Sequence, residues 1–240
     1  MAWINLFAPQ ALDIAKQMTL GPQAKALLAA NPGASAGEFT EAMAGQNLNA
    51  DAVGFLSHGM KPQAGVLWAS ESAAKVAPKL PPAELKAAEL AKAWSQGQAS
   101  PRQLDALLAQ SPPQGPGTWA AQAASLAAKE PAAPGALAAP SALTSTAIGG
   151  SVHLAAAVDT NALQLAAPSV DGLPAVALER PVLKVPEPGM PAMTLPSQLT
   201  PPQLAEMNEA LKPFVELGMK IAKGAPMTPA MSGLSTLPVV

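Results

Sequence analysis

The sequence contains no cysteine and no tyrosine, and aromatic residues make up only 3% of it. Without cysteine the chain cannot form disulfides, thiolate zinc sites or iron–sulfur clusters, and it has no thiol nucleophile. With so few aromatic residues, alanine supplies much of the 49% hydrophobic fraction. Alanine is the best helix former but buries little area, so each larger apolar side chain carries more of the core. These totals favour an all-α fold with close helix contacts.

Charge is also scarce, because charged residues make up 12% of the chain and the formal net charge is −2. No basic stripe or polybasic cluster is present, which argues against nucleic-acid binding and against a membrane-surface anchor. The longest apolar run, residues 146–158, falls short of the roughly 20 residues that span a bilayer. No basic residue precedes Lys16, so a signal peptide is not expected and the predicted location is the cytoplasm.

The chain divides into four segments by composition. Helical patches separated by Pro, Gly and Asn predict a helical domain over residues 1–165, an irregular bundle of antiparallel helix pairs. Residues 166–200 are too rich in proline for helix and too apolar for a free linker, which predicts an extended strap on the domain. Residues 201–224 are expected to form a C-terminal helix that packs back on the domain, and residues 225–240 a tail.

Local signals predict several helix starts. Ser35 and Glu38 have the spacing of a capping box. Asn49 or Asp51 is expected to cap the next helix, and Thr118 to cap a later one.

Two further patterns predict how helices pack. Near the N-terminus, Leu12, Ile14 and Met18 are expected to lie near one face of a helix. The double glycine Gly149–Gly150 is expected where another helix comes close, because glycine is otherwise costly inside a helix.

Residues 62–94 read as two helices joined by a tight turn rich in proline, an αα-hairpin that carries Trp68 and Trp94. We expect both indoles, and that of Trp119, to pack in the core. The alternative is that they form a hot spot for a partner.

The candidate interaction residues are apolar side chains near the N-terminus and in the predicted strap. Trp3 is the best interface candidate of the four tryptophans because it lies near the chain end, and Phe7 is grouped with it. The ten methionines could provide an adaptable binding face. Among them, Met190 and Met193 of the strap are the candidates.

No catalytic constellation emerges from the sequence. His58 and His153 are far apart, and neither belongs to an HExxH pattern. No nucleophile elbow or phosphate-binding loop is present. We therefore predict a protein that is not an enzyme and has no catalytic, cofactor-binding or metal-ligating residues. A pocket that held either histidine beside two carboxylates would favour an enzyme instead.

Four sequence blocks, in order, resemble an uncharacterised family of bacterial helical proteins, a domain of unknown function. The blocks are residues 51–69, 87–94, 143–158 and 213–224. The chain departs from the family pattern after Pro62, where Gln63, Ala64 and Gly65 stand in place of the usual Arg–Glu pair. Leu67 replaces the first of two tryptophans in the same block. If that charged pair binds a ligand in the family, its absence puts the same function in doubt here.

The resemblance implies an association with type VI secretion or related contractile-injection loci. It leads to the hypothesis of a non-catalytic adaptor or chaperone-like protein that binds a secretion spike or effector protein through an apolar helical groove. The rival hypothesis is a structural protein that self-assembles into a homo-oligomer through its apolar helices and strap.

Overall fold

The computed structural model describes residues 3–130, 139–160 and 201–224, and within these residues it shows α-helices and no strand. The all-α prediction is confirmed. The helices are α1 (Ala11–Ala15), α2 (Pro22–Ala30), α3 (Ala36–Gly45), α4 (Asn49–Gly59), α5 (Pro62–Lys75), α6 (Pro82–Ser95), α7 (Pro101–Gln110), α8 (Pro116–Lys129), α9 (Ala142–Asp159) and α11 (Pro201–Ala222). The predicted strap and the predicted tail lie outside the described residues.

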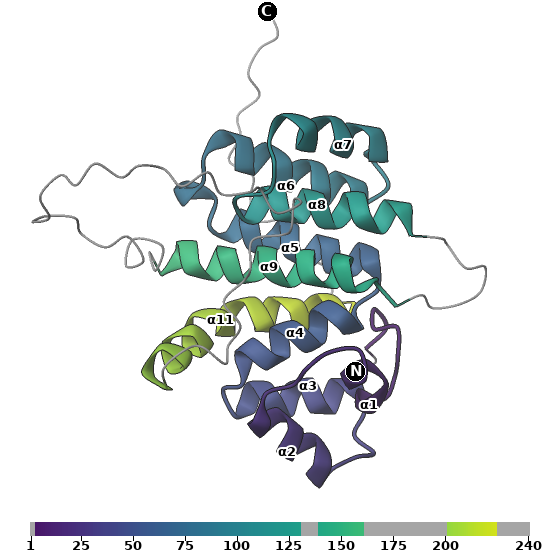
Figure 1. Ribbon diagram of the computed structural model, residues 1–240, viewed down its shortest axis with the longest axis vertical. Coiled ribbons are helices and arrows are strands. Elements are labelled where there is room, and N and C mark those ends of the chain that lie inside the picture. The colour runs from purple at the N-terminus through teal and green to yellow at the C-terminus, as the bar shows by residue number, and fades with distance from the viewer. Residues whose placement is uncertain (1–2, 131–138, 161–200, 225–240) are drawn as a thin grey trace, which may run out of the picture.

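The helices are stacked along the long axis of the molecule (Figure 1). At one end α6 and α8 pack together, with α7 against both, and α5 and α9 form the next level. Helix α11 follows, lying against α4, α5 and α9. At the other end α3 contacts α4, and α1 and α2 pack against α3.

Some helices begin at the N-cap that the local sequence predicts, and others begin where tertiary contacts use the predicted cap residue differently. The capping box is confirmed, because the Ser35 hydroxyl accepts from the Glu38 N–H at 3.2 Å while the Glu38 carboxylate accepts from the Ser35 N–H at 3.0 Å. The hydrogen bonds of this carboxylate to Ser35 lower the Glu38 pKa.

The caps predicted for α4 are wrong. The N-cap of α4 is Leu48, whose side chain cannot accept a hydrogen bond. The amide of Asn49 instead donates to the backbone carbonyl of Asn208 at 2.8 Å, and the Asp51 carboxylate accepts from the backbone of Gly21 at 2.6 Å. Both polar side chains are used by segments distant in sequence.

The prediction of Thr118 as an N-cap is also wrong. Helix α8 begins at Pro116 after the N-cap Gly115, so Thr118 lies inside the first turn. Its N–H and its hydroxyl both donate to the carboxylate of Glu84 on α6, each at 2.9 Å. A carboxylate at this position satisfies free N–H groups and complements the helix dipole.

The αα-hairpin is confirmed, since α5 and α6 pack against each other across a short 3₁₀ turn at Ala77–Lys79. Trp68 is fully buried, and Trp119 is 4% exposed. Both therefore belong to the core, as predicted. Trp94 is half-buried and packs against the core from its edge. The indole N–H of Trp68 donates to the Phe214 carbonyl of α11 at 2.9 Å, a partner beyond the hairpin.

Small residues let the helices approach closely. A Cβ added at Gly65 of α5 would lie 2.6 Å from Cδ1 of Ile148 on α9, and one at Gly117 of α8 would overlap the Glu84 carbonyl of α6. A Cβ at Gly149 would lie 3.4 Å from the Ser57 hydroxyl on α4, which agrees with the predicted close approach. Alanine and glycine thus provide the contact surface between successive helices.

Candidate functional site

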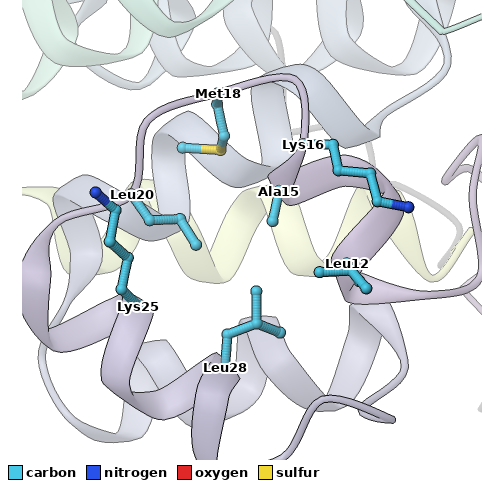
Figure 2. A pocket seen from close by; sticks show the side chains of 7 residues that line it. All are labelled: Leu12, Ala15, Lys16, Met18, Leu20, Lys25 and Leu28. Atoms are coloured by element: carbon cyan, nitrogen blue, oxygen red, sulfur yellow. The ribbon is translucent and has the colours of Figure 1, made fainter.

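An apolar hollow of about 200 Å³ opens between α1, α2 and the loop that joins them (Figure 2). Aliphatic side chains converge on it from the two helices and the loop. Two lysines complete its lining. The lining residues are Leu12, Ala15, Lys16, Met18, Leu20, Lys25 and Leu28.

The hollow exists because α1 is short and its two large apolar side chains point in different directions. Ile14 is fully buried in the core, whereas Leu12 is 43% exposed. The prediction that Leu12, Ile14 and Met18 share a helix face is therefore wrong: α1 ends at Ala15, so Met18 belongs to the loop. Leu12 is left to line the hollow, where in Figure 2 it lies across from Leu20.

Helix α4 contacts the loop between α1 and α2. The Asp51 carboxylate accepts from the Gly21 N–H at the start of α2, and a Cβ added at Gly54 would lie 2.9 Å from the Met18 methyl. Burial raises the Asp51 pKa, and this effect outweighs the lowering by the Gly21 hydrogen bond and by the nearby Lys25 charge. A partly desolvated carboxylate thus ties the start of α2 to α4.

The rim of the hollow is positively charged. The ammonium groups of Lys16 and Lys25 stand on opposite sides of the aliphatic lining (Figure 2). Lys16 pairs with Asp13 at 3.0 Å, but both side chains are more than half exposed, so this pair holds Lys16 only weakly. Lys25 forms no ion pair within the described part of the chain, and it is exposed. An apolar group flanked by carboxylates matches this arrangement.

The predicted interface residues Trp3 and Phe7 are half-buried and pack against the core. The Trp3 indole lies on Gly37 of α3, where a Cβ would overlap the ring, and the Lys223 ammonium lies 4.9 Å from the ring centroid. These contacts anchor the N-terminal segment, and a role for Trp3 and Phe7 in binding stays a prediction. The other two candidates, Met190 and Met193, lie outside the described residues.

The two histidines lie on different helices, His58 on α4 and His153 on α9. Nδ1 of His58 is 2.9 Å from the Gly54 carbonyl one turn earlier in α4. His153 of α9 is half-buried, and desolvation lowers its pKa to about 4, so its imidazole is neutral at pH 7. Among the described residues, no group of three or more histidine, aspartate or glutamate side chains could hold a metal ion.

No described helix combines the length and apolarity needed to cross a membrane. A family model matches residues 39–169, more than half of the chain. The chain belongs to a family of unknown function, DUF6931. No curated protein and no solved structure matches it.

The DUF6931 match confirms the resemblance to a domain of unknown function, and three of the four sequence blocks that carried it lie within the match. The fourth block, residues 213–224, lies beyond it. The matched region, residues 39–169, runs from α3 through α9. The α1–α2 hollow and α11 both lie outside the DUF6931 region.

The hollow could not be found from the sequence. Its lining comes from two short helices whose relative placement depends on α4, and no motif marks the meeting point. The one available signal is the sequence Leu12 to Leu28, where leucines and lysines alternate without a clear helical period.

Proposed function

We propose that the protein is a non-catalytic adaptor that holds an apolar segment of another protein in the α1–α2 hollow. The observation that supports the proposal is the open aliphatic lining between the two lysines. The volume of about 200 Å³ lies below the range of typical small-molecule pockets and suits one or two inserted side chains.

The rim sets the expected chemistry of the partner. Lys16 and Lys25 favour carboxylates on both sides of an inserted leucine or methionine, because opposite charges at a rim steer association and fix orientation. The proposed partner is a secretion spike or effector protein of a type VI or related contractile-injection system. This choice rests on the sequence resemblance alone.

Two exposed leucines provide a matched test. Leu12 lines the hollow and is 43% exposed, whereas Leu143 is 54% exposed on α9, away from the hollow. Leu12→Asp should weaken binding of purified spike or effector proteins encoded beside the gene. Leu143→Asp should leave binding unchanged, and neither variant should shift the melting temperature strongly, because each side chain is already in contact with water.

The lysines give a second measurement. Lys25→Glu should weaken binding and reduce its dependence on salt, since exposed charges are screened as ionic strength rises. Equal binding by Leu12→Asp and Leu143→Asp would refute the hollow as the site. A defined homo-oligomer in light scattering, with no partner bound, would instead favour the self-assembling structural protein.

A further inference from the structure

Helix α2 buries little of its own surface against the rest of the protein. Of its nine residues, two are buried, Ala24 and Leu28, and the helix packs on α3. Its start is tied to α4 by a hydrogen bond, in which the Gly21 N–H donates to the Asp51 carboxylate at 2.6 Å. Because so little apolar area fixes α2, a single strong polar contact can decide where the helix lies.

The contact between Asp51 and Gly21 suits the start of a helix. A carboxylate at this position accepts from a free N–H group and complements the helix dipole. Because the acceptor is charged, the hydrogen bond is roughly twice as strong as one between neutral groups. Gly21 has φ −63° and ψ 163°, which other residues also adopt, so glycine is not needed there for its backbone freedom. It lets the carboxylate come close, because an added Cβ would lie 2.8 Å from Oδ2 of Asp51.

The start of α2 carries one wall of the α1–α2 hollow. Leu20 directly precedes Gly21, and Lys25 and Leu28 follow it on the helix, so these three lining residues move with it. Leu12 of α1 stands on the other side (Figure 2). Helix α1 packs on α3 and α4. A shift of α2 relative to α4 therefore changes the distance between the two walls.

The charge of Lys25 is a weaker link to Asp51 than the hydrogen bond. Burial raises the Asp51 pKa, and of the two effects that lower it, the Gly21 hydrogen bond is larger than the Lys25 charge. Both side chains are described, and no ion pair forms between them. Lys25 is exposed, and water and salt weaken the attraction between charges that are not in contact.

We propose that Asp51 is a positioning residue of the α1–α2 hollow, and that its hydrogen bond to Gly21 sets the place of α2. Asp51 does not line the hollow, so it acts on a ligand through Leu20, Lys25 and Leu28. It lies in the DUF6931 region, whereas the hollow does not. The role in binding rests on the proposed function, but the hydrogen bond places α2 whether or not a partner is present.

The absence of cysteine allows a direct measurement of where α2 lies. Spin labels are attached at Ala29→Cys on α2 and at Glu216→Cys on α11, two exposed positions that do not line the hollow. Helix α11 packs on α4. The distance between the labels, measured by double electron–electron resonance, therefore reports the position of α2 relative to α4. The labelled protein is compared with versions that also carry Asp51→Ala, Asp51→Asn or Gly21→Pro.

We expect a single narrow distance distribution for the labels alone and for Asp51→Asn, whose side-chain oxygen can still accept from the Gly21 N–H. Asp51→Ala removes the acceptor. Gly21→Pro removes the donor at a φ that proline adopts, so both variants should lose the narrow peak. The control is Gly117→Ala on α8, which should destabilise the protein because its Cβ would overlap the Glu84 carbonyl. It should keep the narrow peak.

Three outcomes would overturn the positioning role. The first is a narrow peak in Asp51→Ala or Gly21→Pro. The second is an equal loss of the peak in Gly117→Ala, which would point to a general loss of stability. The third is an equal loss in Asp51→Asn, which would show that the charge places α2. Binding by Leu12→Asp tests the proposed function separately, so either can fail while the other stands.

Discussion

Replacing Trp68 by alanine should be among the most destabilising single changes in this protein. The side chain is fully buried on α5 and lies between its own helix pair and α11. Truncation removes the largest buried side chain of the core, and it also removes the buried donor to the Phe214 carbonyl. Trp68→Ala should therefore weaken both the core of the DUF6931 region and the packing of α11 against it.

The expected loss of unfolding free energy has two contributions: the truncation with its cavity, and the lost indole hydrogen bond. Large-to-small truncation of a buried tryptophan costs about 3–5 kcal/mol of unfolding free energy, including the cavity. Trp68→Phe keeps an aromatic ring in the site but loses the indole N–H, so it should cost less, about 1–3 kcal/mol. Trp94 is half-buried on α6, so Trp94→Ala should cost clearly less than Trp68→Ala.

The assay is urea unfolding followed by far-ultraviolet circular dichroism, which reports helix content without relying on tryptophan fluorescence. The four proteins to compare are the wild type, Trp68→Ala, Trp68→Phe and Trp94→Ala. We expect stability to decrease in the order wild type, Trp68→Phe, Trp68→Ala. An unfolding free energy of Trp68→Ala within about 1 kcal/mol of wild type would refute the reasoning, because a buried tryptophan cannot be removed so cheaply. Equal losses for Trp68→Ala and Trp94→Ala would refute it too.

Three further predictions concern single sites. Gly117→Ala should destabilise by about 1–3 kcal/mol, because its Cβ would overlap the Glu84 carbonyl; Gly45→Ala, with open space around it, should be neutral or stabilising in the same urea titration. Asp51→Ala should lower stability by about 1–3 kcal/mol by leaving the Gly21 N–H without its acceptor, and a loss no greater than that of Asp51→Asn would contradict this. The pKa of His153 is about 4 in the native protein, below its ordinary value of 6.5. As the pH drops, the unfolded chain therefore takes up the proton first. The unfolding free energy should fall as the pH drops from 6.5 towards 4, by at most about 3 kcal/mol. A His153→Gln variant whose stability falls as steeply as wild type over this range would show that another group is responsible.

Sequence signals that act within a few residues predicted the local structure well. The capping box of Ser35 and Glu38 formed as expected, and proline marked the first turn of α5 and α6. The alanine-rich composition predicted close helix packing, and the patterns around residues 62–94 predicted the αα-hairpin. These features depend on backbone propensity and on contacts between neighbours in the chain.

The failed cap predictions share one physical cause. Asn49, Asp51 and Thr118 resemble caps in the sequence, but each meets a stronger partner from a distant segment. A buried polar group takes whichever partner the packed fold brings near, because leaving a donor or acceptor unpaired is costly. Leu12 was misplaced for a related reason: α1 ends too early for the helical period to apply.

The sequence by itself determined that this chain is helical, that α3 begins after the Ser35 cap and α5 at Pro62, and that its core relies on small residues and a few large ones. Only the tertiary structure decided that α1, α2 and their loop line an open apolar hollow between two lysines, and that the Trp68 indole donates a hydrogen bond to a residue 146 positions away. Helix formation is governed by neighbours along the chain. The hollow and the surface on which α11 packs form only when the helices come together. No pattern of neighbouring residues therefore predicts them.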